Sequence, residues 1–405
     1  MQRFTGREYL KIDIANNFGL DKKTWTERLT WFDLNQDKLD ELLPQADEPA
    51  LYHAGVQAWH QVQQGQPIGY PISLDATSSG LQILAALTGD RKAAQICNVV
   101  NHPSGDKRAD AYTIVYEEML RGFGGDAKIK REDTKKAIMT SLYGSKAQPK
   151  RVFGEGEMLT LFLEIMQQLA PAAWELNEAF LTIWDPEALS NDWVLPDNFN
   201  VRVKVMAQVA ESVNFLNEPF DITRSINAPI KDGRSLGANT IHSIDGMIVR
   251  EMVRRCSYDP AWIQLLQDLL ANEGTHFIKG DAKDEALRLV PILWQHYQES
   301  GYLSARILDH LDGDTIKLVD AKVIQELLES LPAKPFQIIT VHDCFRCLPQ
   351  YGNDLRMQYN RQLYEVARSE LLSFLLSQLV KRKVKIGKLD PTLASSILDA
   401  DYSLS

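Results

Sequence analysis

The chain has 405 residues, of which 44% are hydrophobic and 24% are charged, and its formal net charge is −10. This composition is typical of a globular protein of two or three domains. The acidic balance excludes a long-range basic field but leaves room for local basic patches. The sequence has no run of 18 apolar residues and no apolar signal core, so we expect no membrane span and a cytoplasmic location. The four cysteines, two of them in a single C-x-x-C, predict neither a disulfide framework nor a zinc site.

Turn signals and apolar periodicity divide the chain into mainly helical segments. After an aromatic-rich helical segment within residues 1–35, we expect helices over residues 37–66, 78–88, 106–121, 131–143, 156–184 (with a kink or boundary at Pro171), much of 259–330, and 354–382. We expect strands at residues 71–75 and 338–341, and a hairpin within residues 193–234. No internal repeat or low-complexity linker is present, so we expect one intertwined unit.

The first candidate site residue is Asp75, which ends a predicted strand in the stretch GYPISLDATSSGLQILAAL, residues 69–87. Small residues follow it and are too short to cover a carboxylate, and then a helical pattern begins. One interpretation is that Asp75 or Thr77 caps this helix. The other is that Asp75 is a metal ligand at a strand end, which requires a second carboxylate elsewhere.

The stretch QIITVHDCF, residues 337–345, supplies that second carboxylate. His342 and Asp343 stand where a hairpin turn is expected, and Asp is common in turns. Two strands that each end in one Asp are also an economical way to build a two-metal site. Mg²⁺ takes oxygen ligands and keeps positions open for phosphates and water.

The stretch REDTKKAIMTSLYGSK, residues 131–146, makes the two acids informative. Arg131, Lys135, Met139 and Tyr143 follow one another at i+4 spacing and therefore share one helix face, which ends at Gly144. Arg131 and Lys135, one helical turn apart, could bind a triphosphate that lies along the helix. Met139 and Tyr143 could contact the base and the sugar at its far end. A helix that only packs into the core is not expected to carry cations on its apolar face, so this pattern favours a binding site.

Two local basic patches stand out against the acidic chain. One comprises Lys128, Lys130, Arg131, Lys135, Lys136, Lys146, Lys150 and Arg151, and the other is VKRKVKIGK, residues 380–388. A solvated helix face and a nucleic-acid contact are both open interpretations of such runs. If they contact nucleic acid, they line a channel and binding weakens steeply with salt.

Together these motifs resemble the single-subunit RNA polymerases of bacteriophages and mitochondria. The stretches that carry the resemblance, in the order of the family, are YLKIDIANNFGLDK (9–22), LDATSSGLQ (74–82), DAYTIV (110–115), REDTKKAIMTSLYGSK (131–146), NTIHSIDG (239–246), VHDCF (341–345) and ILDADYSLS (397–405). The family usually has Ser where this chain has Cys344, which we expect to matter little.

The resemblance implies roles for individual residues. Asp75, Ala76 and Asp343 would hold two Mg²⁺ ions, and the catalytic set would further include Lys135, Tyr143 and His342. The nucleotide would contact Arg131, Lys135, Met139, Tyr143, Gly144, Lys11 and Tyr112, with Tyr143 reading the ribose 2′-hydroxyl. Nucleic acid would contact His242, Lys146, Lys150 and Arg151.

The implied fold is α/β in the α+β sense, mostly helical: a right-hand polymerase with a small antiparallel palm sheet and helical fingers. We expect the first part of the palm in residues 1–105, the fingers in 106–235, and the second part of the palm with a C-terminal foot in 236–405. The hairpin region 193–234 is open to two interpretations, a promoter-reading loop or a scaffold.

Members of this family normally have a promoter-reading domain, a thumb and an Asp-x-x-Gly-Arg motif before the stretch that matches residues 9–22. Here eight residues precede Tyr9, and Arg3 stands where the Asp of that motif belongs. We therefore expect the larger subunit of a split, heterodimeric phage polymerase, working in the host cytoplasm. Its expected partners are a second polypeptide with the thumb, a DNA template, nascent RNA, rNTPs and a helper that binds single-stranded DNA or recruits the enzyme to promoters.

Two alternatives remain at this stage. A DNA polymerase of the related right-hand fold usually has an aromatic residue at the position of Met139 and Glu at the position of Cys344. Its first motif also has a Glu that blocks the 2′-hydroxyl, where Ser78 and Ser79 leave space. A non-catalytic DNA-binding subunit would have no reason to keep Asp75 and Asp343.

Overall fold

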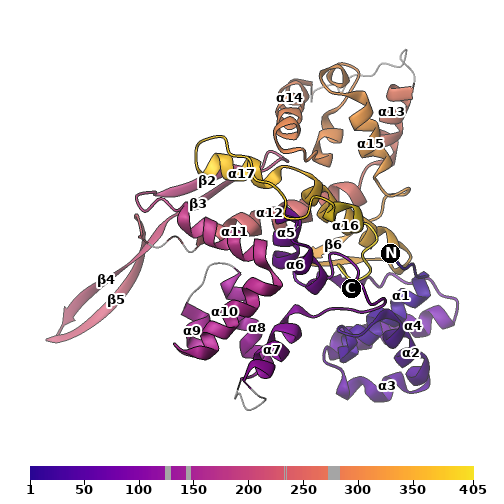
Figure 1. Cartoon of the computed structure of the whole chain (residues 1–405). Helices are drawn as coiled ribbons and strands as arrows, with labels where there is room; N and C mark the ends of the chain where they lie inside the picture. Colours follow the sequence, from indigo (N-terminus) through magenta and orange to yellow (C-terminus); the bar gives the residue numbers. More distant parts are fainter. Residues whose placement is uncertain (124–128, 143–146, 232, 234, 272–282) are drawn as a thin grey trace.

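The computed structural model describes residues 1–123, 129–142, 147–231, 233, 235–271 and 283–405. A small sheet lies near the centre of the molecule and helical groups surround it (Figure 1). The described chain is mostly helical with small antiparallel sheets, which confirms the predicted fold class. None of its helices combines the length and the apolar character that are needed to cross a bilayer.

The first helical group comprises α1 (Gly6–Ala15), α2 (Trp25–Asn35), α3 (Leu39–Leu42) and α4 (Pro49–Gln63). Capping boxes begin two of its helices: Thr5 with Glu8 at α1, and Thr24 with Glu27 at α2. Each pair of side chains satisfies backbone N–H groups that have no partner inside the helix. Helix α1 packs against both α2 and α4.

The central sheet is antiparallel and has the strand order β1-β7-β6. Its strands are β1 (Ile72–Asp75), β6 (Ile339–Val341) and β7 (Cys344–Cys347). Helices α5 (Ser79–Thr88) and α6 (Arg91–Ile96) follow β1. The strand and the helix that were predicted around Asp75 are thereby confirmed.

A second helical group, the α7–α11 group, comprises α7 (Ala111–Gly122), α8 (Arg131–Ser141), α9 (Ala147–Phe153), α10 (Glu157–Leu169) and α11 (Pro171–Thr182). Pro171 stands at the first position of α11, where its missing N–H has no cost. The predicted break at Pro171 is therefore a boundary between two helices. The expected hairpin region contains two hairpins, β2 (Ser190–Val194) with β3 (Asn200–Lys204), and β4 (Met206–Phe215) with β5 (Glu218–Asn227).

Helix α12 (Ser235–Cys256) packs against α5, α11 and α16 (Gly352–Arg368). The following helices α13 (Pro260–Ala271), α14 (Lys283–Ser300) and α15 (Ala321–Glu329), with 3₁₀ turns at Ala305–His310 and Thr315–Leu318, lie at the top of Figure 1. They surround a hydrophobic cluster of their own, which includes Ile263, Leu293, Leu308 and Ile324. The expectation of one intertwined unit is corrected here, because the described residues of α13, α14 and α15 gather around a separate core.

The helix predicted over residues 354–382 is two helices, α16 and α17 (Leu371–Leu379). Ser369 between them has extended backbone angles, and the backbone N–H of Glu370 bonds to the carbonyl of Ser300 at 2.7 Å. A tertiary hydrogen bond thus replaces the helical one, which periodicity alone cannot reveal.

Asp13 connects α1 to the central sheet. Its buried carboxylate accepts the backbone N–H of Ser73 at 2.7 Å, the hydroxyl of Tyr70 at 2.7 Å and the side-chain amide of Asn17 at 3.1 Å. Burial raises the pKa of Asp13 to about 6, and these hydrogen bonds offset only part of the rise.

We predict that Asp13 makes stability depend on pH. Because its pKa is higher in the folded chain than in the unfolded one, its stabilising protonation is complete below about pH 4 and is lost as pH rises through about 6. Between pH 5 and pH 7 this group should lower the free energy of unfolding by about 1 kcal/mol. Urea denaturation of wild type and Asp13→Asn at both pH values measures it. An equal change in both proteins would contradict the assignment.

Asp197 fastens the β2–β3 hairpin to α12. The carboxylate is fully buried and bonds to Nε of Arg250 at 2.7 Å and to Nη1 of Arg254 at 3.0 Å. Burial alone would raise the pKa of Asp197, but the two guanidinium groups outweigh it and the pKa is lowered.

We predict that Asp197→Ala lowers the free energy of unfolding by about 3 kcal/mol at pH 7, because it leaves the partly buried Arg250 without its anion and Arg254 with Glu251 alone. The matched control is Asp192→Ala on the same hairpin, which removes an exposed pair with Arg202 at 3.5 Å and should cost less than about 1 kcal/mol. Urea denaturation of the two variants tests the difference, and similar losses would refute it.

Candidate active site

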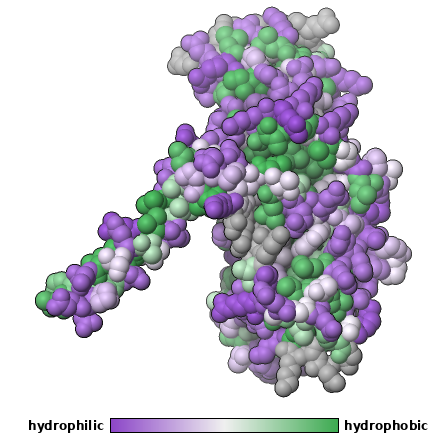
Figure 2. Space-filling model, turned by 60° about the vertical axis from the view of Figure 1, so that its left-hand side comes forward, coloured by the Kyte–Doolittle hydropathy of each residue, from purple (hydrophilic) through white to green (hydrophobic). Residues whose placement is uncertain are grey.

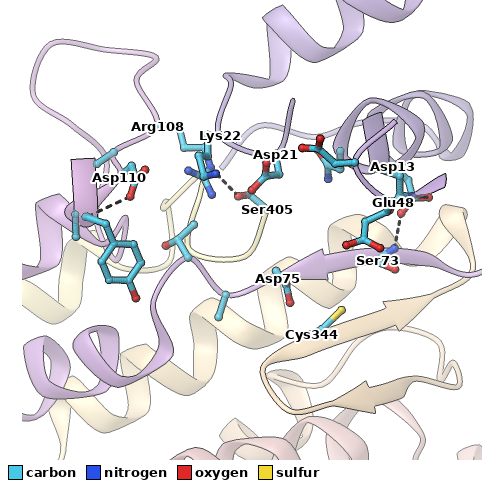
Figure 3. Close-up of a pocket in the computed structure, with 18 of the residues that line it drawn as sticks. Asp13, Asp21, Lys22, Glu48, Ser73, Asp75, Arg108, Asp110, Cys344 and Ser405 are labelled. Carbon is cyan, nitrogen blue, oxygen red and sulfur yellow. Dashed lines mark hydrogen bonds between the residues drawn. The ribbon is translucent and has the colours of Figure 1, made fainter. Parts of the chain in front are cut away.

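An open cavity of about 530 Å³ lies between the first helical group, the central sheet and the start of the α7–α11 group (Figure 3). Its described lining includes the carboxylates of Asp13, Asp21, Asp47, Glu48, Asp75 and Asp110. Its cations are Lys22, Arg108, Arg131, Lys135 and Arg346. The cavity is thus polar and carries both signs of charge, as a site for a charged ligand and cations requires.

The sheet brings Asp75 and Asp343 together from opposite parts of the sequence. Asp75 is the last residue of β1 and pairs with Cys344, the first residue of β7, so Asp343 is one residue from that pair. The backbone N–H of Ala76 also bonds to the carbonyl of Asp343 at 3.1 Å. Partial desolvation and, second, the negative charge of Asp343 raise the pKa of Asp75. The two carboxylates are therefore close enough to repel one another.

Neither of the predicted helix caps is present. The N-cap residue of α5 is Ser78, without a side-chain cap bond, and the hydroxyl of Thr77 instead donates to the carbonyl of Cys97 at 2.8 Å. Asp75 ends its strand with its side chain at the cavity (Figure 3). The capping interpretation of Asp75 and Thr77 is wrong.

A third carboxylate, Asp245, also lies near Asp343. Its pKa is raised to about 6, first by burial and second by the charge of Asp343, while His342 lowers it. Ser79 at the start of α5 donates to Asp245 at 3.3 Å. The sequence analysis missed Asp245, although it stands three residues after His242 on the same helix, where two side chains share a face.

His342 and Cys344 flank Asp343 in the turn between β6 and β7. His342 has the left-handed φ of 55°, a conformation that His adopts more readily than most residues. The thiol of Cys344 interacts with Asp75, and desolvation followed by that carboxylate raises the pKa of Cys344 to about 12. Cys344 is thus a neutral thiol that interacts directly with Asp75.

The predicted cationic stripe faces the cavity. Arg131 and Lys135 line it, and Met139 on the same face is exposed, while Thr134 and Ile138 are buried. The helix therefore puts its cations at the cavity and packs its other side into the core, as predicted.

Neighbouring side chains fix these two cations. Nε of Arg131 donates to the hydroxyl of Thr113 at 2.7 Å, and its guanidinium also pairs with Asp110. The ammonium of Lys135 lies 5.4 Å from the ring centre of Tyr112, whose hydroxyl is 3.3 Å from that of Ser78. Tyr112 also lines the cavity, so three of the predicted nucleotide-contacting residues meet there.

Lys11 does not line the cavity in the described structure. Its ammonium pairs with Asp33 at 2.6 Å and lies over the rings of Phe32 and Trp59, and Lys11 is absent from the described lining of the cavity. Lys22, which ends the same sequence motif, lines the cavity instead. The expectation that Lys11 reaches the phosphates is corrected: its side chain belongs to the packing of the first helical group.

Residues 403–405 pair along Asp75 and complete one wall, which the sequence analysis did not foresee. The backbone N–H of Ser405 bonds to the carbonyl of Asp75 at 2.9 Å, and Nε of Arg108 donates to the hydroxyl of Ser405 at 3.2 Å. The preceding aromatic residue, Tyr402, stacks on Trp25 at 5.1 Å. The segment thus holds the end of β1 in place.

The remaining predicted residues are placed as follows. Tyr143, Gly144 and Lys146 lie outside the described residues. His242 is exposed on α12, and on α9 Lys150 pairs with Glu155 at 2.9 Å, next to an exposed Arg151. The second basic patch, residues 380–388, follows α17 and, in the described structure, borders a different, more apolar groove.

Comparison with known proteins agrees with this geometry. Residues 4–152 match the family model of DNA-dependent RNA polymerase. The DNA-directed RNA polymerase of Pseudomonas phage phiKMV is 24% identical over 331 residues, which is 65% of this chain and 40% of that protein. The mitochondrial DNA-directed RNA polymerase of Schizosaccharomyces pombe is 31% identical over 34% of this chain and 14% of that protein.

A mitochondrial DNA-directed RNA polymerase of Neurospora crassa is 30% identical over 35% of this chain and 12% of that protein. The chain therefore spans two fifths or less of the length of these relatives. The matched segment contains Asp75, Arg131 and Lys135, and in this segment the chain is similar to DNA-dependent RNA polymerases of phages and mitochondria.

Proposed function

We propose that this chain forms the palm and fingers of a DNA-directed RNA polymerase. One observation carries the proposal: Asp75 at the end of β1 lies near Asp343, which directly precedes the paired strand β7, and Arg131 and Lys135 face the cavity that Asp75 lines. The similarity to RNA polymerases covers three of these four residues. The reaction would be template-directed transfer of a nucleotide from an rNTP to an RNA 3′-hydroxyl.

Magnesium ions fit the carboxylates at the strand ends. Desolvation and, second, the like charge of Asp343 raise the pKa of Asp75, and a bound cation would offset both effects. Asp75 and Asp343 would hold two Mg²⁺ ions, with the backbone of Ala76 between them. When bound, such ions activate the attacking hydroxyl and stabilise the leaving oxygen.

The cations opposite would hold the triphosphate. Asp110 and Thr113 fix the guanidinium of Arg131, which has five N–H donors and so keeps some for a phosphate. Lys135 would add a second positive charge one turn along α8. Because both groups are held before the nucleotide arrives, little side-chain freedom is lost on binding.

Several assignments rest on the family resemblance alone. Met139, Tyr143 and Gly144 would contact the sugar and base, and Tyr143 would read the 2′-hydroxyl. His242 would touch the new base pair, and Lys146, Lys150 and Arg151 would contact nucleic acid. His342 would pack beside the metal ions, in agreement with its position next to Asp343.

The proposed partners are a DNA template, nascent RNA and a second polypeptide that carries the thumb. The chain spans two fifths of the phage relative, so the rest of such an enzyme is carried either by further residues of the same polypeptide or by a second chain. We propose the second arrangement, a heterodimer, with a helper protein for duplex opening. Purification of the complex from its natural source distinguishes the two arrangements.

We predict that Asp343→Asn abolishes RNA synthesis by the assembled enzyme, lowering it on the order of 10³-fold, because a metal ligand is lost. Extension of a primed template with labelled rNTPs measures it, and parallel reactions with dNTPs test the DNA-polymerase alternative. The control is Asp309→Asn, outside the cavity. Unchanged synthesis in Asp343→Asn would favour a non-catalytic DNA-binding subunit.

We predict that Lys135→Met raises the KM for rNTPs about tenfold, since one charged contact to phosphate is worth about 1.5 kcal/mol. Lys11→Met should leave the KM within about twofold and only lower stability, because its ammonium contacts Asp33 and two rings. Steady-state kinetics of both variants is the measurement. A larger effect on KM in Lys11→Met would restore Lys11 as the phosphate ligand.

A further inference from the structure

The central sheet has one face in the core and one face open to the cavity. Residues that are opposite each other in an antiparallel pair share a face, and neighbours along a strand alternate. The buried face comprises Ile72, Leu74, Phe345 and Cys347. The other face, the open face, comprises Ser73, Asp75, Ile339, Val341, Cys344 and Arg346. Figure 3 shows its members Ser73, Asp75 and Cys344 on neighbouring strands. The face that carries Asp75 thus also carries an arginine.

Arg346 is a cation of the cavity that has no role in the nucleotide site described above. It is opposite Ser73 on the middle strand of the sheet and lines the cavity. In the described structure no carboxylate forms an ion pair with its guanidinium, and its Nε is buried without a hydrogen-bond partner. A buried N–H donor without a partner is unfavourable. Arg346 is therefore able to bind a further acceptor.

The acidic neighbours of Arg346 do not neutralise it. Burial raises the pKa of Asp13 and of Asp75, and the charge of Arg346 offsets part of each rise. Both oxygens of Asp13, however, already accept hydrogen bonds from other groups. The thiol of Cys344 is neutral, because desolvation and the charge of Asp75 raise its pKa to about 12. The guanidinium thus keeps donors for an oxyanion that enters the cavity, and phosphate matches its planar geometry.

The other cations of the described cavity lining come from different elements. Arg131 and Lys135 lie on α8, Arg108 precedes α7, and Lys22 follows α1. Arg131 and Lys135 are the proposed ligands of the triphosphate. Arg346 instead lies on the strand that pairs with β1, beside Asp75. A phosphate at Arg346 would therefore lie on the sheet itself and would belong to a different part of the substrates.

The strand register sets the distance from Arg346 to the site of reaction. The pair of Ser73 and Arg346 is two residues along the strands from the pair of Asp75 and Cys344, which is about 7 Å. The terminal nucleoside of an RNA spans a comparable length between its 3′-hydroxyl and its own phosphate. We propose that Arg346 binds the phosphodiester that joins the last two nucleotides of the RNA, which rests on the proposed reaction of the 3′-hydroxyl near Asp75.

The apolar part of the open face agrees with such a ligand. Ile339 is opposite Arg346, and Val341 is opposite Cys344. These two side chains are 55% and 51% exposed. A nucleotide that covered them would remove apolar surface from water, which is favourable. A free phosphate would leave them exposed, so the open face fits a nucleotide of a strand better than an isolated anion.

The test removes the charge from each partner of the contact in turn. On the protein the change is Arg346→Gln in the assembled enzyme. On the RNA a methylphosphonate replaces the last phosphodiester, and the penultimate nucleotide lacks its 2′-hydroxyl in the changed and unchanged primers alike, which keeps the linkage stable. Each primer is annealed to a DNA template and ends in a 3′-deoxynucleotide. It therefore binds together with the next rNTP but does not react.

We expect the methylphosphonate to weaken binding of the primed template to the wild-type enzyme about tenfold, because one charge-assisted hydrogen bond is lost. Arg346→Gln should weaken binding of the unchanged primer by about the same factor. The two changes together should cost no more than either alone, since both remove one contact. The affinity for the rNTP should change less than about twofold, and Arg346→Lys should recover part of the loss.

The matched control is Arg288→Gln. It removes an exposed arginine from α14, in the second core at the top of the molecule in Figure 1 and Figure 2. Both affinities should stay within about twofold of the wild type. A methylphosphonate penalty that persists in full in Arg346→Gln would overturn the proposal. So would a larger loss of affinity for the rNTP than for the primer, because Arg346 would then contact the triphosphate.

The methylphosphonate comparison in the wild-type enzyme needs no variant, so it tests the contact even where Arg346→Gln does not fold. Equal affinity of the wild type for the two primers would overturn this contact alone. A wild-type enzyme that binds neither primed template would overturn the proposed function as well. Because these primers do not react, the result is independent of whether Asp343 supports RNA synthesis.

Discussion

The antiparallel pairing of β1 with β7 is the constraint on which the candidate site depends. Asp75 and Asp343 are separated by most of the chain, and only the register that sets Asp75 opposite Cys344 brings them together. A shift by one residue would turn Asp75 to the other face of the sheet. The bond from Ala76 to Asp343 and the pairing of residues 403–405 along Asp75 both oppose such a shift. Backbone hydrogen bonds thus hold two carboxylates at a distance where they repel.

That repulsion explains the charge arrangement of the cavity. Desolvation first, and the negative charge of Asp343 second, raise the pKa values of Asp75 and Asp245, so part of each rise is the cost of holding acids together. Arg131, held by Asp110, and Lys135 line the cavity from α8, whereas Arg346 lies on β7 beside the carboxylates and lowers the pKa of Asp75. The positive charge of Arg346 therefore offsets only part of the rise in that pKa.

The sequence analysis identified those parts of the site that local patterns encode. A strand followed by small residues predicted Asp75, and i+4 spacing predicted that Arg131 and Lys135 share a face. It did not identify the residues whose position in the site depends on tertiary contacts. The only local signal for Asp245 is its spacing of three residues from His242, which does not show that it lies near Asp343. Lys11 and Lys22 belong to one motif whose orientation depends on the packing of α1. Similarly, the break between α16 and α17 depends on a hydrogen bond from a distant segment.

Helix α12 connects the candidate site to the parts of the molecule that extend from it. It carries Asp245 at the site, and one turn further on Arg250 begins the pairs with Asp197 that hold the β2–β3 hairpin. On its last turns, Glu251 accepts the backbone N–H of Ala305 at 2.8 Å and Arg255 bonds to Ser330, which attaches the second core. Buried charges with several partners do not rearrange cheaply. The β2–β3 hairpin, the second core and Asp245 are therefore attached to one helix.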